Sequence, residues 1–402
     1  MTTQKKTYLA SSLAKATLGL CLFPFLSQAE ALEYEITATL ASGATFWAPD
    51  TASASFSISS STAQFEYGLS LNSSDTAVNF DGSFAEWHSG GWTIGLGAID
   101  RHWSPSAYSS LIFSHNARPV PSIYAAYDAE AGIDFPLLEY LGPLSVETFH
   151  GQLETDRPVP QTKLFGARLT IEPIEDLEVS FVRTAQWGGD GYDNSFDAFL
   201  RMLAGQQDIG DEPNQLAGYS VSYTFNSGLR TYFQAIGEDE ASSLPTCYSR
   251  MAGLEGTTSI FGNPTLLTLE AVDTTIERTT SGFCGPNTAY NNGHYPGGYT
   301  HYSRVMGVPI DTESQSLTLY GKTSLPDADV AWLLGYADLN KDNLATHRLT
   351  PSRTTGGFAG LAITRSFGAA EVTGSLRYQS FDLNTDYGSE GISAAISISQ
   401  TF

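Results

Sequence analysis

Residues 392–402 alternate between apolar and small polar side chains and end on an aromatic residue. One face of such a strand carries Ile392, Ala394, Ile396, Ile398 and Phe402. This pattern suits a transmembrane β-barrel, whose strands turn apolar side chains toward lipid and polar ones toward a lumen. A soluble edge strand this apolar would invite aggregation unless it were paired. The chain end therefore favours a barrel over a secreted solenoid or multi-sandwich protein, and its terminal aromatic residue resembles the signal read by the barrel-insertion machinery.

The N-terminal residues 1–31 have the layout of a secretory signal peptide. Lys5, Lys6 and Lys15 precede an apolar stretch from Ala16 to Leu26, and small residues predict cleavage after Ala29 or Ala31. A lipoprotein cut before Cys21 is the alternative, but a bulky leucine before that cysteine fits the reaction poorly. No later window approaches the roughly 18–20 uninterrupted apolar residues of a membrane helix. We expect a signal peptide at 1–31 and one domain over 32–402.

Composition supports a barrel and excludes one class of partner. Charged residues make up only 16% of the chain, which contains 38 Gly, 20 Tyr and 22 Phe. Mean hydropathy is slightly negative, as expected when strands alternate apolar and polar faces. The formal net charge is −23, whereas nucleic-acid binding needs clustered Lys and Arg. We therefore expect no nucleic-acid partner.

Turn spacing gives the topology, because outer-membrane barrels have short periplasmic turns and longer outer loops. Tight turns are predicted at 172–176, 226–228, 262–264, 325–329 and 368–370, and a longer segment separates each neighbouring pair. In the N-terminal part we place strands near 33–47, 52–59, 61–71, 77–88, 91–100, 121–133, 143–153 and 162–171, and ten more between 177 and 402. The fold class is all-β: an antiparallel barrel of about 18 strands with both termini in the periplasm.

The longest predicted outer segments are 101–120, 188–214, 239–250, 274–314 and 339–355. Residues 196–203, after possible N-caps at Asn194 and Ser195, predict a short helix resting in the barrel mouth. Cys247 and Cys284 fall in neighbouring outer segments, and a disulfide between them is the economical interpretation; two free thiols are the alternative.

The outer segments contain sequence blocks whose order and spacing resemble the capsule-assembly Wzi family of outer-membrane lectins. The blocks are Arg-His-Trp-Ser-Pro at 101–105, Ser-His-Asn-Ala-Arg-Pro-Val-Pro at 114–121, Gln-Trp-Gly-Gly-Asp at 186–190, Gly-Glu-Asp at 237–239, Tyr-Asn-Asn-Gly-His-Tyr-Pro-Gly-Gly-Tyr at 290–299 and Arg-Val-Met-Gly at 304–307. The resemblance implies an eighteen-stranded barrel that binds capsular polysaccharide and is not a transport channel. Family members usually carry a helical plug before the barrel, whereas strand-like alternation here begins within a few residues of the predicted cleavage site.

Saccharide recognition needs flat aromatic faces, planar hydrogen-bonding groups and, for uronic acids, arginine. The outer segments supply all three types. The candidate polysaccharide-binding residues are His102, Trp103, Asn116, Arg118, Trp187, His294, Tyr295, Tyr299 and Arg304. For each aromatic residue the competing interpretation is a membrane-interface girdle or packing within the loops.

Acidic clusters and catalytic motifs give no stronger assignment. Residues 238–240, and Asp190, Asp193 and Asp197, offer hard oxygens for Ca²⁺, but no calcium-loop spacing is present and a solvated charge run is favoured. The chain has no Gly-x-Ser-x-Gly and no His-Glu-x-x-His, and its 7 His are scattered. We expect no enzyme activity, no cofactor and no metal.

The sequence thus predicts an outer-membrane lectin with loops on the cell exterior of a Gram-negative bacterium. Its expected partners are capsular polysaccharide or exopolysaccharide, together with outer-membrane lipid and lipopolysaccharide, and we expect a monomer. A diffusion porin is the first alternative, favoured by the missing plug and the acidic charge balance, and a barrel enzyme acting on lipid or polymer is the second.

Overall fold

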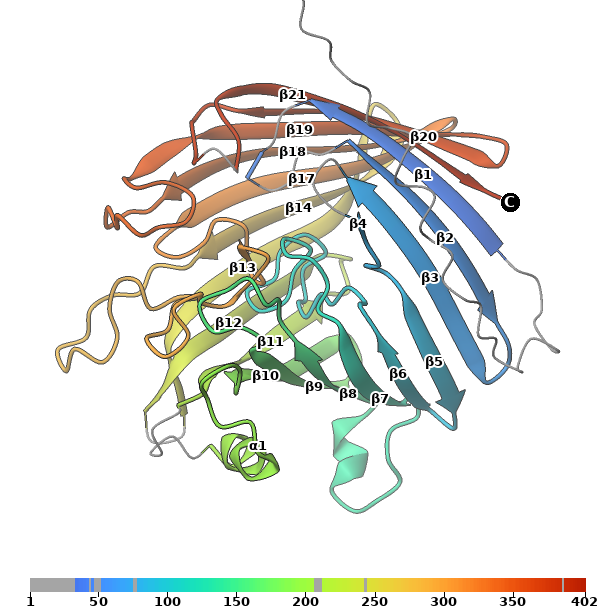
Figure 1. Cartoon of the computed structure of the whole chain (residues 1–402). Coiled ribbons are helices and arrows are strands. Elements are labelled where there is room, and N and C mark those ends of the chain that lie inside the picture. The colour runs from blue at the N-terminus through green and yellow to red at the C-terminus, as the bar shows by residue number, and fades with distance from the viewer. Residues whose placement is uncertain are drawn as a thin grey trace, which may run out of the picture.

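The structure is a computed structural model that describes residues 33–42, 45–46, 52–74, 78–205, 212–241, 244–384 and 387–402. The predicted signal peptide lies outside the described residues. Figure 1 shows one sheet rolled into a ring, with loops gathered at one end. Within the described residues, no helix is long and apolar enough to cross a membrane.

Antiparallel strands connected in sequence order form the wall. Its first half consists of β1 (Glu33–Ser42), β2 (Ser53–Ser61), β3 (Phe65–Ser74), β4 (Val78–Asn79), β5 (Phe84–Ser89), β6 (Trp92–Gly97), β7 (Ser122–Ala129), β8 (Leu144–Gln152), β9 (Lys163–Ile174) and β10 (Leu177–Trp187). Its second half consists of β11 (Asn214–Thr224), β12 (Arg230–Ala241), β13 (Leu244–Ile260), β14 (Asn263–Asp273), β17 (Gln315–Leu325), β18 (Ala328–Leu339), β19 (Thr354–Phe367), β20 (Ala370–Gln379) and β21 (Gly391–Thr401).

The ring closes between the first and last strands. β1 pairs with β21 in an antiparallel register from Glu35 opposite Thr401 to Ser42 opposite Ala394. The sheet contains 19 strands among the described residues, and the two-residue β4 only adds to the edge of β3, so 18 strands close the barrel. The predicted all-β barrel and its strand number are confirmed.

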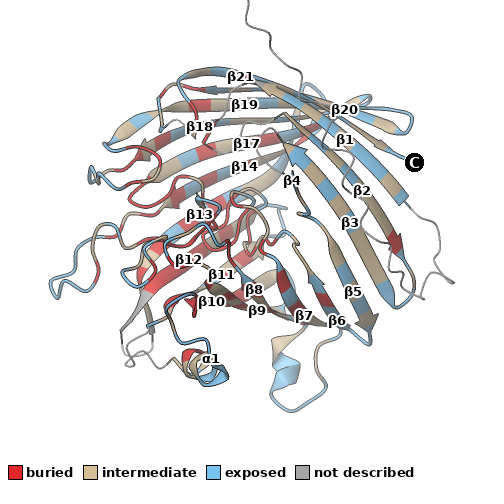
Figure 2. Cartoon of the chain, viewed as in Figure 1, coloured by how far each residue is buried: buried red, intermediate tan, exposed pale blue. Residues whose placement is uncertain are grey.

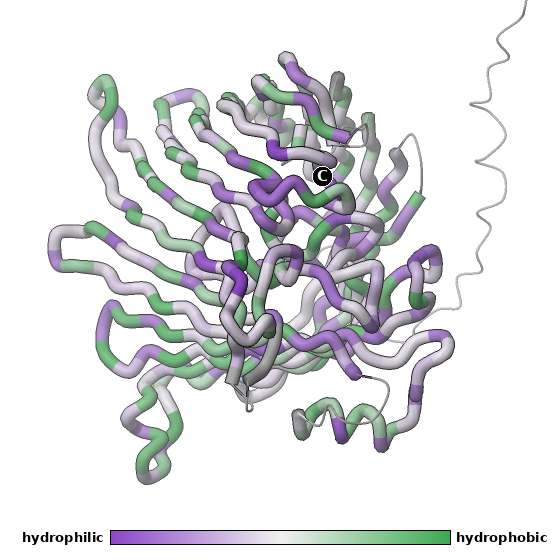
Figure 3. Tube along the Cα trace, turned by 90° about the vertical axis from the view of Figure 1, so that its left-hand side faces the viewer, coloured by the Kyte–Doolittle hydropathy of each residue, from purple (hydrophilic) through white to green (hydrophobic). Residues whose placement is uncertain are grey.

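The wall faces lipid as the alternation predicts. On β21, Ile392, Ile396 and Ile398 are exposed on the outer face, as is the terminal Phe402, while Ser393 is buried. Apolar and polar residues alternate along the strands in Figure 3. In a closed barrel the backbone N–H and C=O groups form hydrogen bonds between neighbouring strands, and no strand edge is left open. A wall with this apolar exterior is therefore compatible with a bilayer.

Buried residues gather on β7–β14 and in the outer loops, and are sparse on β1–β3, β20 and β21 (Figure 2). The main buried cluster joins inward-facing wall residues such as Phe149 and Tyr232 to loop residues such as Leu111, Tyr290 and Met306. The core of this barrel therefore consists of outer loops folded onto one side of the lumen.

Three features differ from the sequence-based expectation. The segment 239–250, predicted as a long outer loop, is instead the top of the β12–β13 hairpin, because the strands pair as far as Ala241 opposite Leu244. The predicted strand 77–88 is divided into β4 and β5 by a turn at Asp81–Gly82. The periplasmic connection 130–143 is long and contains a 3-10 helix, η2 (Leu138–Leu141).

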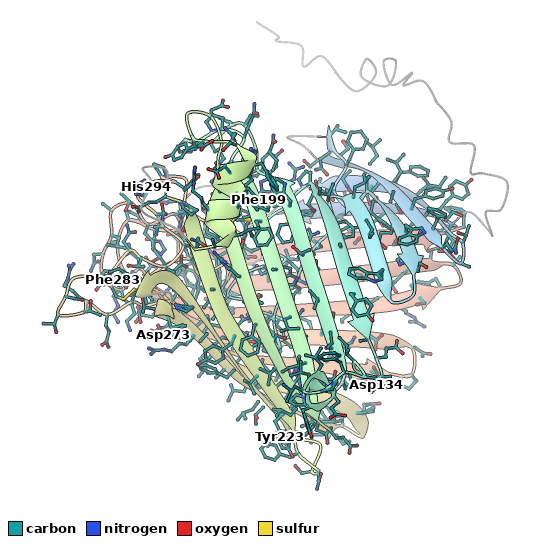
Figure 4. All side chains as sticks on the ribbon, turned by 90° about the horizontal axis from the view of Figure 1, so that it is seen from below. Asp134, Phe199, Tyr223, Asp273, Phe283 and His294 are labelled. Atoms are coloured by element: carbon teal, nitrogen blue, oxygen red, sulfur yellow. A yellow bond between two sulfur atoms is a disulfide. The ribbon has the colours of Figure 1, made fainter. Side chains whose placement is uncertain are left out.

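Helix α1 (Phe196–Leu203) has the predicted bounds, and the Ser195 side chain accepts a hydrogen bond from the Ala198 N–H as N-cap. It lies against the outside of the wall beside β10, not in the mouth (Figures 1 and 4). The prediction of its position was wrong, because its apolar residues pack on outward-facing Phe165 and Trp187.

Cys247 and Cys284 form a disulfide with a Cα–Cα distance of 5.4 Å. Cys247 lies on β13 and not in an outer loop, whereas Cys284 lies in the long connection between β14 and β17. The bond ties this connection to the barrel wall. It stabilises the fold mainly by restricting the conformations open to the unfolded chain.

Candidate functional site

The connection between β6 and β7, residues 98–121, folds into the barrel and crosses the lumen (Figure 1). The Ser106 hydroxyl donates to Glu270 on β14, and the Tyr232 hydroxyl on β12 donates to the same carboxylate at 2.7 Å. Tyr108 stacks on Tyr320 of β17 with ring centroids 3.9 Å apart. These contacts hold the tip of the segment, here called the lumen loop, against the wall.

Trp103 anchors the base of the lumen loop to β8 through its side chain and to β12 through its carbonyl, which accepts from Gln234 Nε2 at 2.7 Å. Its side chain is 2% exposed, and its Nε1–H donates to Glu147 Oε2 on β8 at 3.0 Å. The indole packs edge-to-face on Phe113 and Phe149, with centroids 5.0 and 5.6 Å away. Arg101 donates to the other Glu147 oxygen at 2.9 Å. Trp103, a predicted sugar platform, is therefore a packing residue in this structure.

Three further predicted aromatic residues are buried. Tyr299 is 0% exposed, and Tyr295 is 1% exposed with its hydroxyl donating to the Gly188 carbonyl at 3.3 Å. Trp187 is 6% exposed and faces the outside of the barrel beneath α1. The competing interpretation, loop packing, describes all three rings.

His102 and Asn116 also hold loops together. His102 Nε2 lies 2.7 Å from the Ser106 carbonyl, and burial lowers the pKa of this imidazole, which favours its neutral form. Asn116 Nδ2 donates to the Val305 carbonyl at 2.8 Å, and Asn116 Oδ1 accepts from Arg304 at 2.7 Å. Asn116 thereby joins the lumen loop to the connection between β14 and β17.

One group of predicted and additional residues remains accessible at the barrel mouth. We name it the mouth patch; it consists of Asp81, Arg118, Tyr302, Arg304 and Tyr387. The Arg118 guanidinium donates to both carboxylate oxygens of Asp81, at 2.7 and 3.0 Å, and lies 4.0 Å from the centre of the Tyr302 ring. Tyr302 is 48% exposed, and the Arg304 guanidinium lies 5.4 Å from the Tyr387 ring centre.

Tyr302 is presented by a small hairpin of β15 (Thr300–His301) and β16 (Arg304–Val305). Tyr302 and Ser303 both have positive φ, 48° and 65°, as a two-residue type I′ turn requires. The base of the hairpin is buried: the Arg157 guanidinium donates to the Thr300 carbonyl at 3.0 Å. The exposed ring therefore stands on a fixed support.

A buried hydrogen-bonded pair completes that support. His301 Nδ1 lies 2.6 Å from Glu154 Oε2, and both side chains are at most 5% exposed. Burial by itself raises the pKa of Glu154, but the hydrogen bond from His301 and the charge of Arg157 outweigh it and leave that pKa below its ordinary value. Glu154 is thus the charged partner that fixes the imidazole beneath Tyr302.

The mouth patch combines two kinds of recognition chemistry. The hydrogen bond to Asp81 raises the pKa of Arg118, so its guanidinium stays charged and planar beside the aromatic ring. An exposed tyrosine can cover the C–H face of a sugar ring, and the arginine can donate to hydroxyls or to a carboxylate. This arrangement suits an anionic or neutral saccharide at the rim.

His294 belongs to a separate exposed group at the outer end of the barrel (Figure 4). Its Nε2 lies 3.3 Å from Glu212, and the Tyr192 hydroxyl donates to its carbonyl. The structure therefore does not bring the nine predicted residues into one site: Arg118 and Arg304 share the mouth patch, and Asn116 lies beneath it.

Sequence reasoning missed Asp81, Tyr302 and Tyr387. Tyr302 had a usable signal, because it lies between predicted Tyr299 and Arg304 in a segment rich in Gly and Tyr. Asp81 fell within a predicted strand, and Tyr387 in a connection not singled out as long. Their proximity depends on barrel closure, which brings β3–β5 near β20–β21 through β1 and β2.

Among the described residues, the acidic and histidine side chains that lie close enough together to share a cation do not belong to the acidic clusters singled out in the sequence. Glu238 is 4% exposed and accepts the Tyr290 N–H at 2.9 Å, so it is a buried acceptor and not a member of a solvated charge run. Inside the lumen, Glu66, Glu86 and His88 place ligand-type atoms within 4.8 Å of one another. His88 Nε2 lies 3.3 Å from Glu86 and 3.9 Å from Glu66, and contacts between a histidine and two carboxylates account for this group.

The family model described as capsule assembly protein Wzi matches residues 27–390. The chain belongs to this family. A curated relative, an uncharacterized 55.8 kDa protein in the cps region of Klebsiella pneumoniae, is 31% identical over 170 residues. That alignment covers 40% of this chain and spans about a third (34%) of the relative's length.

Solved structures confirm the fold. Wzi of Escherichia coli, described as an outer-membrane protein involved in group 1 capsule assembly and a carbohydrate-binding β-barrel, has a TM-score of 0.77 at 23% identity, covering 91% of this chain and 83% of that one. OccK3 of Pseudomonas aeruginosa has a TM-score of 0.51 at 9% identity, covering 92% and 95%. Family membership and the closed barrel with its apolar exterior place this chain in the outer membrane, with the long loops outside.

Proposed function

We propose that this protein is a surface lectin whose mouth patch binds capsular polysaccharide or a related exopolysaccharide and helps to keep it on the cell. Membership of a capsule-assembly family supports the process. The observation that carries the proposal is the exposed Tyr302 ring beside the charged Arg118 at the outer mouth. An exposed aromatic ring beside a charged guanidinium is a combination that saccharide binding uses.

The finer parts of this proposal follow from the same features. A lumen crossed by an anchored loop favours a binder over a diffusion porin. We propose no catalytic role, since the ionisable groups of the mouth patch are engaged in ion pairs and hydrogen bonds, and no cofactor. A barrel that closes within one chain supports a monomer, and its exterior would contact outer-membrane lipid and lipopolysaccharide. We also propose that residues 1–31 are removed as a signal peptide.

The test separates polysaccharide into cell-bound and released fractions in a deletion strain complemented with variants. Tyr302→Ala and Arg118→Ala should each shift polymer into the medium while the barrel keeps its heat-modifiable gel shift. Arg353→Ala is the matched control, because Arg353 forms an equivalent two-bond pair with Asp338, at 2.8 and 2.7 Å, on another outer loop.

Two outcomes would contradict the proposal at different levels. If both mouth-patch variants retain polymer as the parent does, the patch is not the site. If the deletion strain itself shows an unchanged split between cell-bound and released polymer, the lectin function fails and the porin hypothesis takes its place.

A further inference from the structure

Helix α1 lies on the side of the wall that faces lipid. Outward orientation follows from the register: on β10, Phe181 is 50% exposed and pairs with outward-facing Tyr219. Side chains on one face of a strand recur every second residue, so Ala185 and Trp187, four and six residues after Phe181, point to the same outer face. Since α1 packs on these residues, it is outside the barrel, as both Figure 1 and Figure 4 show.

The helix is held firmly on this surface. The Phe199 ring meets Trp187, Phe165 and His150, with centroids 5.2, 5.9 and 5.8 Å away. Arg183, also on the outward face, donates to the carbonyls of Leu203 and Met202 at 2.9 and 2.8 Å. The last carbonyls of a helix lack the partners that a further turn would supply, and Met202 O also accepts the Gly205 N–H at 3.0 Å. Arg183, projecting from the wall, adds charged donors to this end and so caps the C-terminus of α1.

Packing on the wall leaves a second apolar edge of α1 uncovered. Phe196 is 73% exposed and Leu200 is 46% exposed, and their spacing of four residues places them on one stripe. The neighbouring stripe is polar: Arg201 pairs with Asp197, and with Asp193 at 2.9 Å. The helix therefore has three faces: one packs on the wall, a second is apolar and exposed, and a third is polar and exposed.

We propose that α1 is an interfacial helix that inserts Phe196 and Leu200 among the acyl chains of outer-leaflet lipid. Lipid is the expected partner because of where the helix lies. α1 begins just beyond the outer end of β10, and its uncovered apolar edge adjoins a wall that faces lipid. An amphipathic helix in the boundary region buries an apolar face and keeps its charged face in water. Trp187 and Lys163, whose ammonium lies 4.4 Å from the indole centre, mark the same boundary.

The test uses paired cysteine variants of the mature protein, refolded into nanodiscs of phosphatidylcholine. Leu200→Cys and, as the matched control, Asp197→Cys are each labelled with the environment-sensitive dye NBD; the native cysteines are held in their disulfide. We expect the Leu200 label to emit at shorter wavelength and to be quenched several-fold more strongly by doxyl-labelled lipid than the Asp197 label. Aqueous iodide should show the reverse preference.

Equal quenching of both labels by doxyl lipid, or equal access of iodide to both, would overturn the proposal. Phe196→Cys gives an independent probe of the same stripe if Leu200→Cys does not refold, with refolding judged by the heat-modifiable gel shift. Nanodiscs containing lipopolysaccharide then distinguish lipopolysaccharide from phospholipid as the lipid in contact. Polysaccharide is absent throughout, so the result is independent of the proposed lectin function.

Discussion

Trp103 shows how a residue of the right chemistry can have a structural role. It is the ring on which the lumen loop rests, and its Nε1–H satisfies a Glu147 oxygen. Trp103→Ala should leave a cavity and an unpaired acceptor, and costs of about 3–5 kcal/mol are typical for such a truncation. We expect a lowered unfolding temperature in detergent, measured by the gel shift on heating. Tyr302→Ala, whose ring is 48% exposed, is the control and should unfold near the parent's temperature.

The residue scale is also where the sequence predicts least. The sequence indicated the chemistry of the outer loops and included Arg118 and Arg304 among the candidates. It did not show that Tyr302 is exposed whereas Tyr299, three positions earlier, is buried. Tyr299 is buried because it precedes the hairpin whose turn lifts Tyr302 into solvent. Whether a loop aromatic packs or binds depends on contacts across hundreds of residues, which periodicity does not encode.

The connection between β14 and β17 contains an acid whose titration should be measurable. Glu313 accepts the N–H groups of Asn287 and Ile276 at 3.1 and 3.3 Å, and burial raises its pKa to about 7. A carboxyl with a folded pKa above its unfolded value contributes stability below the unfolded pKa and loses it as pH rises through the folded pKa. We expect residues 274–314 to open more readily at pH 8.5 than at pH 5.5.

Hydrogen exchange, corrected for intrinsic rates, measures this opening. Because each unit of pKa shift corresponds to a tenfold factor, the opening equilibrium should change by about tenfold or more between the two pH values. Glu313→Gln keeps an acceptor for both N–H groups and has no charge to bury, so it should remove the dependence. A variant that keeps the full pH dependence would show that another group is responsible.

Elements with local signals were predicted well, and elements defined by pairing were not. The bounds of α1 follow from the Ser195 cap and the apolar run after it. Its place outside the wall depends on Phe165, which the sequence presents as an ordinary strand residue, and on Trp187, which was predicted to bind sugar. The β12–β13 hairpin extends to Ala241 although residues 238–240 are acidic. Inter-strand pairing and a buried partner for Glu238 outweigh the loop-like composition.

At the scale of the whole molecule, alternation and turn spacing sufficed to predict the barrel and its strand number. Both patterns recur in every hairpin, so a single error, such as predicting β4 and β5 as one strand over 77–88, does not change the predicted barrel. The state of the lumen is different. A barrel of 18 strands has room for a water-filled channel, and its closure depends on where one loop folds.

The lumen loop should therefore decide conductance. Its tip contacts β12, β14 and β17, and its base contacts β8 and β12, so the loop is bonded to the wall over the arc from β8 to β17. The parent protein should conduct little in planar bilayers, and replacing residues 104–110 with two glycines should raise single-channel conductance severalfold. Deleting residues 280–282 from an exposed outer loop is the control and should leave conductance low. A parent that already conducts as an open porin would contradict the loop's blocking role, and with it the main structural reason for preferring a binder over a channel.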